Sequence, residues 1–128
     1  DCKECREYWP MQSYARAFRR IGFDHGTILA ETYDLGGNLR GVFPTARVVT
    51  PGYPVQVFGA AVPGPCLLVW EGDHAPSKAL SDYLAQNYGA TVKDATTQGD
   101  VNAPRRTSKT RRATMNYILI QKGRCGGA

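Results

Sequence analysis

Three stretches of the sequence have the apolar spacing of amphipathic helices. Within each stretch, hydrophobic residues recur every three or four positions, which places them on one face of a helix. Pro10 and Gly22 bound the first stretch, because proline suits the first helical turn and glycine suits the end of a helix. Pro44 limits the second stretch, since the residue before a proline is biased away from helical geometry. The predicted helices cover residues 10–21, 33–43 and 76–88.

Short apolar segments between these helices predict β-strands. The segment 66–70 is apolar at every position, which is typical of a central strand buried on both faces of a parallel sheet. Two connections, residues 51–65 and 97–112, are rich in proline, glycine, threonine or basic residues, and we expect both to be loops. The predicted strands cover residues 27–30, 46–50, 66–70, 90–96 and 113–121.

Strands that alternate with helices predict one α/β domain over residues 1–128, with a mostly parallel sheet flanked by helices. The last two strands add an antiparallel hairpin at one edge. A chain of 128 residues is long enough to bury a single core. Its longest apolar run, residues 66–70, is far shorter than the ~20 residues that a membrane-spanning helix needs. We expect no spanning helix within this sequence.

Positive charge is concentrated near the C-terminus, which indicates anionic partners. The chain has a net charge of +5, yet residues 101–128 contain no acidic residue and seven basic ones. Such a loop attracts phosphates or anionic lipid head groups. Nucleic acid is the less favoured partner, because the loop has no aromatic residue on which a base could stack. Its clustered cations are Arg105, Arg106, Lys109, Arg111 and Arg112.

The carboxyl ends of the predicted parallel strands define a candidate ligand rim, because open α/β sheets bind their ligands there. Carboxylates and a histidine at this rim suit acid–base chemistry or cation binding. Acidic residues are equally ordinary in solvated loops, and we favour that plainer interpretation. We predict no metal and no cofactor. The rim candidates are Glu31, Thr32, Tyr33, Asn38, Arg40, Tyr53, Glu71, Asp73 and His74.

Two adjacent glycines open the helix that follows the first predicted strand. The segment reads Gly-Gly-Asn-Leu-Arg-Gly, which does not match the G-x-G-x-x-G spacing of dinucleotide-binding turns. Glycine here can bring a ligand or a neighbouring element close to the backbone. We favour packing, and expect Gly37 to lie at the contact between helix and sheet.

The four cysteines leave several interpretations open. Cys2 and Cys5 have the two-residue spacing of redox and zinc sites, but they lie at the start of the chain rather than between a strand and a helix. We favour a disulfide or free thiols for this pair, then zinc, then redox catalysis. A zinc site would need Cys66, Cys125 or a histidine as well. Cys66 begins an apolar strand, and we expect it to be a buried free thiol.

Residues 26–40, together with Phe43-Pro44 and Ala46-Arg47-Val48, carry a resemblance to a known family. The distinctive part is Tyr-x-x-Gly-Gly-Asn-Leu-Arg over residues 33–40. The chain resembles the extracytoplasmic C-terminal domain of bacterial multi-pass glycosyltransferases. These enzymes are relatives of protein mannosyltransferases and of the lipid A aminoarabinose transferase.

The resemblance implies a role in moving a sugar from a polyprenyl-phosphate carrier to an acceptor. In such enzymes the catalytic acids lie in the membrane portion, so no catalytic residue is carried over to this chain. The implied domain is excised from the C-terminus of a larger membrane protein. It packs on the transmembrane portion of the same polypeptide, at the periplasmic or extracytoplasmic face, and helps to admit the carrier or the acceptor.

Two other classes of function remain open. The basic loop allows a small α/β module that binds nucleic acid or phosphate. The strand-end rim allows a small stand-alone enzyme that acts on nucleotides or phosphates, although the failed glycine fingerprint weakens this alternative.

Overall fold

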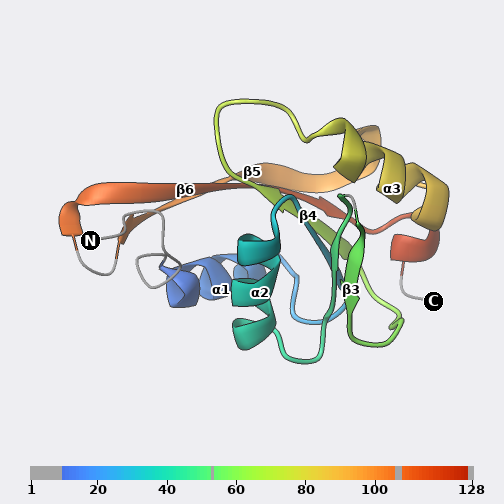
Figure 1. Ribbon diagram of the computed structural model, residues 1–128, viewed down its shortest axis with the longest axis horizontal. Coiled ribbons are helices and arrows are strands. Elements are labelled where there is room, and N and C mark those ends of the chain that lie inside the picture. Colours follow the sequence, from blue (N-terminus) through green and yellow to red (C-terminus); the bar gives the residue numbers. More distant parts are fainter. Residues whose placement is uncertain (1–9, 53, 106–107, 127–128) are drawn as a thin grey trace.

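A six-stranded mixed sheet with three α-helices forms the structure (Figure 1). The computed structural model describes residues 10–52, 54–105 and 108–126, and of residues 104–105 and 108–113 the backbone alone. The helices are α1 (Met11–Arg20), α2 (Tyr33–Val42) and α3 (Lys78–Tyr88), and the 3₁₀ turns are η2 (Val92–Asp94) and η3 (Gly123–Cys125). The strands are β1 (Thr27–Ala30), β2 (Arg47–Thr50), β3 (Gln56–Phe58), β4 (Cys66–Trp70), β5 (Ala95–Arg105) and β6 (Ser108–Ile120).

The strand order is β3-β2-β1-β4-β6-β5, which confirms the α/β class. The centre is parallel: β1 pairs with β2 on one side and with β4 on the other. Both edges are antiparallel, since β3 pairs with β2, and the β5–β6 hairpin adds to β4 through β6. All five residues of β4 are buried, as expected for its apolar sequence.

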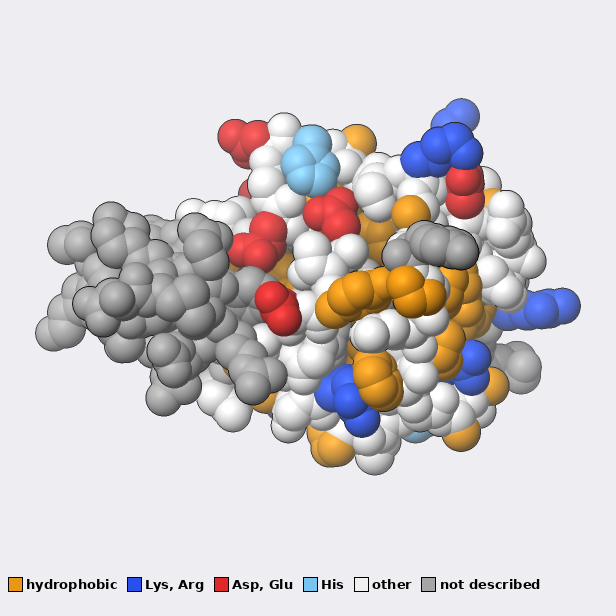
Figure 2. All heavy atoms as spheres, in the orientation of Figure 1, with side chains coloured by type: hydrophobic (Ala, Val, Ile, Leu, Met, Phe, Trp, Pro, Cys, Tyr) orange, Lys and Arg blue, Asp and Glu red, His pale blue; other side chains and the backbone are white. Residues whose placement is uncertain are grey.

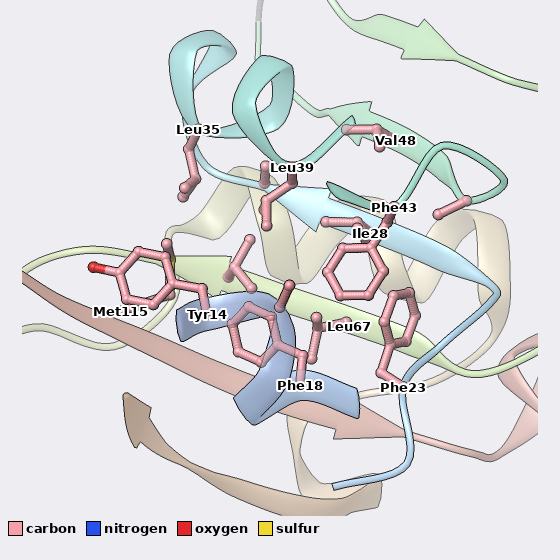
Figure 3. Packing of buried hydrophobic residues seen from close by; sticks show 14 of the residues in the cluster. Tyr14, Phe18, Phe23, Ile28, Leu35, Leu39, Phe43, Val48, Leu67 and Met115 are labelled. Carbon is pink, nitrogen blue, oxygen red and sulfur yellow. The ribbon is translucent and has the colours of Figure 1, made fainter. Parts of the chain in front are cut away.

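Alternate side chains of the central strands supply two cores, one on each face of the sheet. Ile28 and Leu67 face α1 and α2, where they join the aromatic side chains of Phe18 and Phe43 (Figure 3). On the opposite face, Leu29 and its neighbours pack against α3. Among the described residues no helix is long and apolar enough to span a bilayer.

Polar and glycine residues set the limits of the helices. The side chain of Thr32 accepts a hydrogen bond from the backbone of Leu35 at the start of α2, and Ser77 caps α3 in the same way. Such caps satisfy backbone donors that have no partner within the helix. Gly89 ends α3 in the left-handed conformation, with φ of 63°. The predicted helices are therefore confirmed to within a few residues.

Two predicted loops were wrong in part. Residues 51–65 include the short strand β3, and most of residues 97–112 belong to the β5–β6 hairpin. The outer side of β5 faces water, so its strand lacks a continuous apolar run; Val101 and Ala103 are among its described side chains that turn inward. The predicted strand 90–96 begins instead with η2, because Thr91 and Asp94 form a capping box around that turn.

Close packing of α2 on the sheet depends on Gly36 rather than on Gly37. A Cβ atom on Gly36 would lie 3.0 Å from the Thr50 hydroxyl oxygen and 3.3 Å from a methyl group of Val48. Gly37 is exposed, and a Cβ atom there would meet nothing within 4 Å. The expectation that Gly37 forms the contact was wrong by one position, which in a helix is a rotation of roughly 100°.

A disulfide joins Cys66 at the start of β4 to Cys125 in η3, so the prediction of a free thiol at Cys66 was wrong. The two Cα atoms are 5.1 Å apart, although 59 residues separate them in the sequence. Cys66 lies opposite Ile120 in the sheet, and the chain turns back after β6 to bring Cys125 into reach. Cys2 and Cys5 lie outside the described residues. Cys66 and Cys125 are not available as zinc ligands.

Candidate functional site

The carboxyl ends of three adjacent parallel strands meet at one rim of the sheet. Glu31 and Thr32 follow β1, and Glu71, Asp73 and His74 follow the neighbouring strand β4. The backbone N–H of Glu31 donates to the carbonyl of Val69, so the rim begins while the two strands are still paired. The fold therefore brings together residues that lie some 40 positions apart in the sequence, as the strand-end argument predicts.

The imidazole of His74 faces the carboxylate of Glu31 across the rim. The Nε2 atom of His74 lies 3.9 Å from the Oε1 atom of Glu31, and the side chain of Glu31 is the more buried of the two. The Nδ1 atom of His74 is 2.7 Å from the carbonyl oxygen of Ala75. An N–H at Nδ1 would donate to this carbonyl, so attraction to the Glu31 carboxylate requires a second proton, on Nε2.

The loop after β4 is held by two side chains that are absent from the predicted rim. The indole N–H of Trp70 donates to the carbonyl of His74, and the amide of Asn116 donates to the carbonyl of Gly72, each at 2.7 Å. Gly72 has φ of 102°, and a Cβ atom there would lie 2.9 Å from the His74 ring. The loop thus fixes the histidine against the glycine backbone. Asn116 is 44 residues from Gly72 in the sequence, so this hydrogen bond can be recognised only once β4 and β6 are known to pair.

Of the residues predicted in α2, Tyr33 lies beside the rim and Asn38 and Arg40 do not. The Tyr33 hydroxyl donates to the carbonyl of Pro54 at 2.6 Å, which ties the start of α2 to the loop after β2. Asn38 donates to the carbonyl of Asp34 within its own helix. The Arg40 guanidinium lies 3.8 Å above the ring of Phe58 on β3. Tyr53 lies outside the described residues.

The rim presents hydrogen-bonding side chains at the ends of the parallel strands. The carboxylates can accept hydrogen bonds from hydroxyl groups, whereas the single hydroxyl proton of Tyr33 is already donated to the Pro54 carbonyl. Within the described part of the chain, no group of three or more metal-ligating side chains comes together. Figure 2 shows acidic side chains and a histidine beside exposed hydrophobic side chains on one face of the molecule.

The basic segment occupies the distal part of the β5–β6 hairpin. Strand β6 pairs with β4 only over residues 116–120, so the rest of the hairpin extends beyond β4 as a two-stranded ribbon (Figure 1). The backbone of Arg105, Lys109, Arg111 and Arg112 lies in these strands. Arg106 and the side chains of the other four cations lie outside the described residues.

Comparison with known proteins relates part of the chain to a glycosyltransferase. Over 72 residues, or 55% of its length, it is 36% identical to the lipopolysaccharide core galacturonosyltransferase RgtA of Rhizobium johnstonii. The match covers 14% of that protein, so the chain spans only a small part of its relative's length. No protein-family model matches the chain, and no solved structure matches it. The chain is thus similar, over about half its length, to one segment of a glycosyltransferase.

Proposed function

We propose that this chain is a non-catalytic domain of a membrane glycosyltransferase that takes its sugar from a polyprenyl-phosphate carrier. The similarity to a galacturonosyltransferase is the observation that carries the proposal. By analogy with that relative, the sugar is a uronic acid and the acceptor a lipopolysaccharide core. The domain assists entry of the carrier or the acceptor, and its partner is the transmembrane portion of the same polypeptide.

The Cys66–Cys125 disulfide supports a position at the periplasmic or extracytoplasmic face of the cytoplasmic membrane. Structural disulfides form and persist in oxidising compartments and are rare in the reducing cytosol. Both sulfur-bearing residues are fully buried, which shields the bond from exchange with external thiols.

Two regions of the domain have separate roles in the proposed function. The rim around Glu31 and His74 accepts and donates hydrogen bonds, as a sugar with several hydroxyl groups requires. The basic hairpin neutralises phosphate, either on the carrier or on lipid head groups, since each arginine or lysine near an anionic surface contributes about 1 kcal/mol.

The proposal is tested by separating binding from transfer. The purified chain should bind micelles that contain polyprenyl-phosphate-linked galacturonic acid, yet transfer no sugar to a lipopolysaccharide core acceptor. Changing Arg105, Arg106, Lys109, Arg111 and Arg112 to glutamine should weaken this binding in a salt-dependent manner and leave the fold intact. Glu31→Gln should change binding to the sugar-loaded carrier, since it removes a negative charge facing the uronic acid, and should leave binding to the unloaded polyprenyl phosphate unchanged.

Two results would contradict the proposal. Turnover by the isolated chain would show that it carries its own catalytic residues. Tight oligonucleotide binding that survives physiological salt, without carrier binding, would favour the nucleic-acid alternative. Sequencing the reading frame upstream of Asp1 is an independent check, since the proposal expects hydrophobic membrane spans there.

A further inference from the structure

An uncharged segment of the chain lies at the surface. Residues 48–70 contain no Asp, Glu, Lys, Arg or His. Within them, residues 54–63 run from the loop after β2 through β3 and into the next loop, and eight of these ten residues are exposed. Gln56 is the one residue in this segment with a polar side chain. We refer to residues 54–63 as the apolar edge.

Large exposed hydrophobic side chains gather at the apolar edge. Val55, Val57 and Phe58 are 48%, 41% and 36% exposed, and Tyr33, which bonds to Pro54, is 41% exposed. Val57 lies opposite Val49 and Phe58 opposite Val48, so their side chains point to opposite faces of the sheet. The hydrophobic surface therefore wraps around the strand as a ridge. Contiguous surfaces of this kind mark interaction sites.

The ridge is better suited to a broad surface than to a partner strand. Edge strands of soluble domains are usually blunted by charged side chains, and β3 has none. With only three residues, however, β3 offers few backbone groups to a strand that would add to the sheet. Side chains, rather than backbone hydrogen bonds, must provide most of the contact.

Positive and negative side chains lie toward opposite ends of the strands beside the ridge. Arg40 stacks on Phe58, and the backbone of Arg47 lies against Gly59, both toward the amino ends of the parallel strands. Neither arginine forms a salt bridge within the described residues. The carboxylates Glu31 and Glu71 lie at the opposite, carboxyl ends of the strands. One side of the ridge is therefore hydrophobic and positively charged.

We propose that the apolar edge is a membrane-docking surface that inserts its side chains among the head groups of an anionic lipid bilayer. Aliphatic and aromatic side chains would enter the head-group region, and Arg40 would meet lipid phosphate. A second copy of the chain is a poorer occupant, because β3 has only three residues and offers little backbone for pairing of two edges. This inference goes beyond the proposed function and does not depend on sugar transfer.

The test compares two edges of the same sheet. The double variant Val55→Asp, Val57→Asp should lower partition into vesicles of phosphatidylcholine and phosphatidylglycerol by about tenfold or more, because two apolar contacts are lost and charge is added. The matched control, Thr96→Asp with Gln98→Asp, places the same charges on exposed residues of the opposite edge strand β5. It should retain most of the wild-type binding.

Two further measurements locate the contact. Hydrogen exchange should show vesicle-dependent protection of the amides in residues 54–63. Arg40→Gln should reduce the preference for anionic over pure phosphatidylcholine vesicles without disturbing β3. Equal losses in the two double variants, or no protection of residues 54–63, would overturn the proposal. A dimer that forms without vesicles and is abolished by Val55→Asp, Val57→Asp would also overturn it.

Discussion

The two faces of the sheet are stabilised by different means. On the face covered by α1 and α2, aromatic rings pack in contact, with Phe18 and Tyr117 at 5.7 Å and Phe23 and Phe43 at 5.3 Å between centroids. On the other face a single helix, α3, covers a smaller cluster, and the Cys66–Cys125 disulfide lies within it. Where one helix supplies less packing, a covalent bond restricts the unfolded chain instead.

Of the changes considered, removal of the disulfide should lower the free energy of unfolding the most. Replacing Cys66 and Cys125 by alanine should lower the free energy of unfolding by about 4 kcal/mol, because the bond closes a long loop in the unfolded chain. Denaturant titration of the oxidised wild type and of the variant measures the difference. Reductant should destabilise the wild type and leave the variant unchanged. Equal stability of the two proteins would show that packing alone holds the α3 face.

The contact between α2 and the sheet offers a matched pair of glycines. Gly36→Ala should destabilise the protein by about 1 kcal/mol, because the new methyl group crowds Thr50 by more than helix propensity gains. Gly37→Ala should stabilise it by roughly 1 kcal/mol, since the methyl group meets open space. Thermal unfolding of both variants gives the comparison. Equal shifts in melting temperature would mean that the contact between α2 and the sheet accommodates an added methyl group without strain.

A smaller effect on stability is expected from Asp94, in the turn η2 that follows α3. The hydrogen bond from the Thr91 backbone N–H, followed by the Lys122 ammonium at 3.2 Å, lowers the pKa of this carboxyl below its usual range. Since the folded pKa is the lower one, the carboxylate stabilises the fold above the unfolded pKa. That contribution is lost as the pH falls below the unfolded pKa and through the lower folded one.

Asp94→Asn should therefore flatten the acid limb of the plot of unfolding free energy against pH. Lys122→Gln should remove only part of the pH dependence, because the backbone donor of Thr91 remains. An Asp94→Asn variant that keeps the wild-type slope would show that this turn does not couple proton binding to folding.

The elements of the parallel half could be predicted because their local signals agree with the tertiary structure. The apolar run of β4 and the spacing in α1 and α3 each correspond to a buried surface in the fold. The antiparallel β5–β6 hairpin at the edge was predicted and is confirmed, but its length was not, because the pairing extends through a largely polar sequence by backbone hydrogen bonds. Alternation of Val101 and Ala103 is a signal in β5 that could have extended the predicted strand.

Topology alone brings some of the predicted rim residues close together, whereas helix rotation and contacts between residues distant in sequence determine where the others lie. Glu31 and His74 come together because their strands are neighbours. Arg40 points to β3, since its position on α2 carries it away from the strand ends. Asn116 and the Cys66–Cys125 bond depend on where β6 joins the sheet, which no local pattern encodes.

The position of β6 between β4 and β5 also has a consequence for biosynthesis. Strand β4 is made before β6, the partner that covers its second edge through residues 116–120. A nascent chain therefore carries five consecutive apolar residues on an open strand edge until these residues leave the ribosome. Until β6 closes the sheet, this edge is the part of the described chain most prone to associate with other strands.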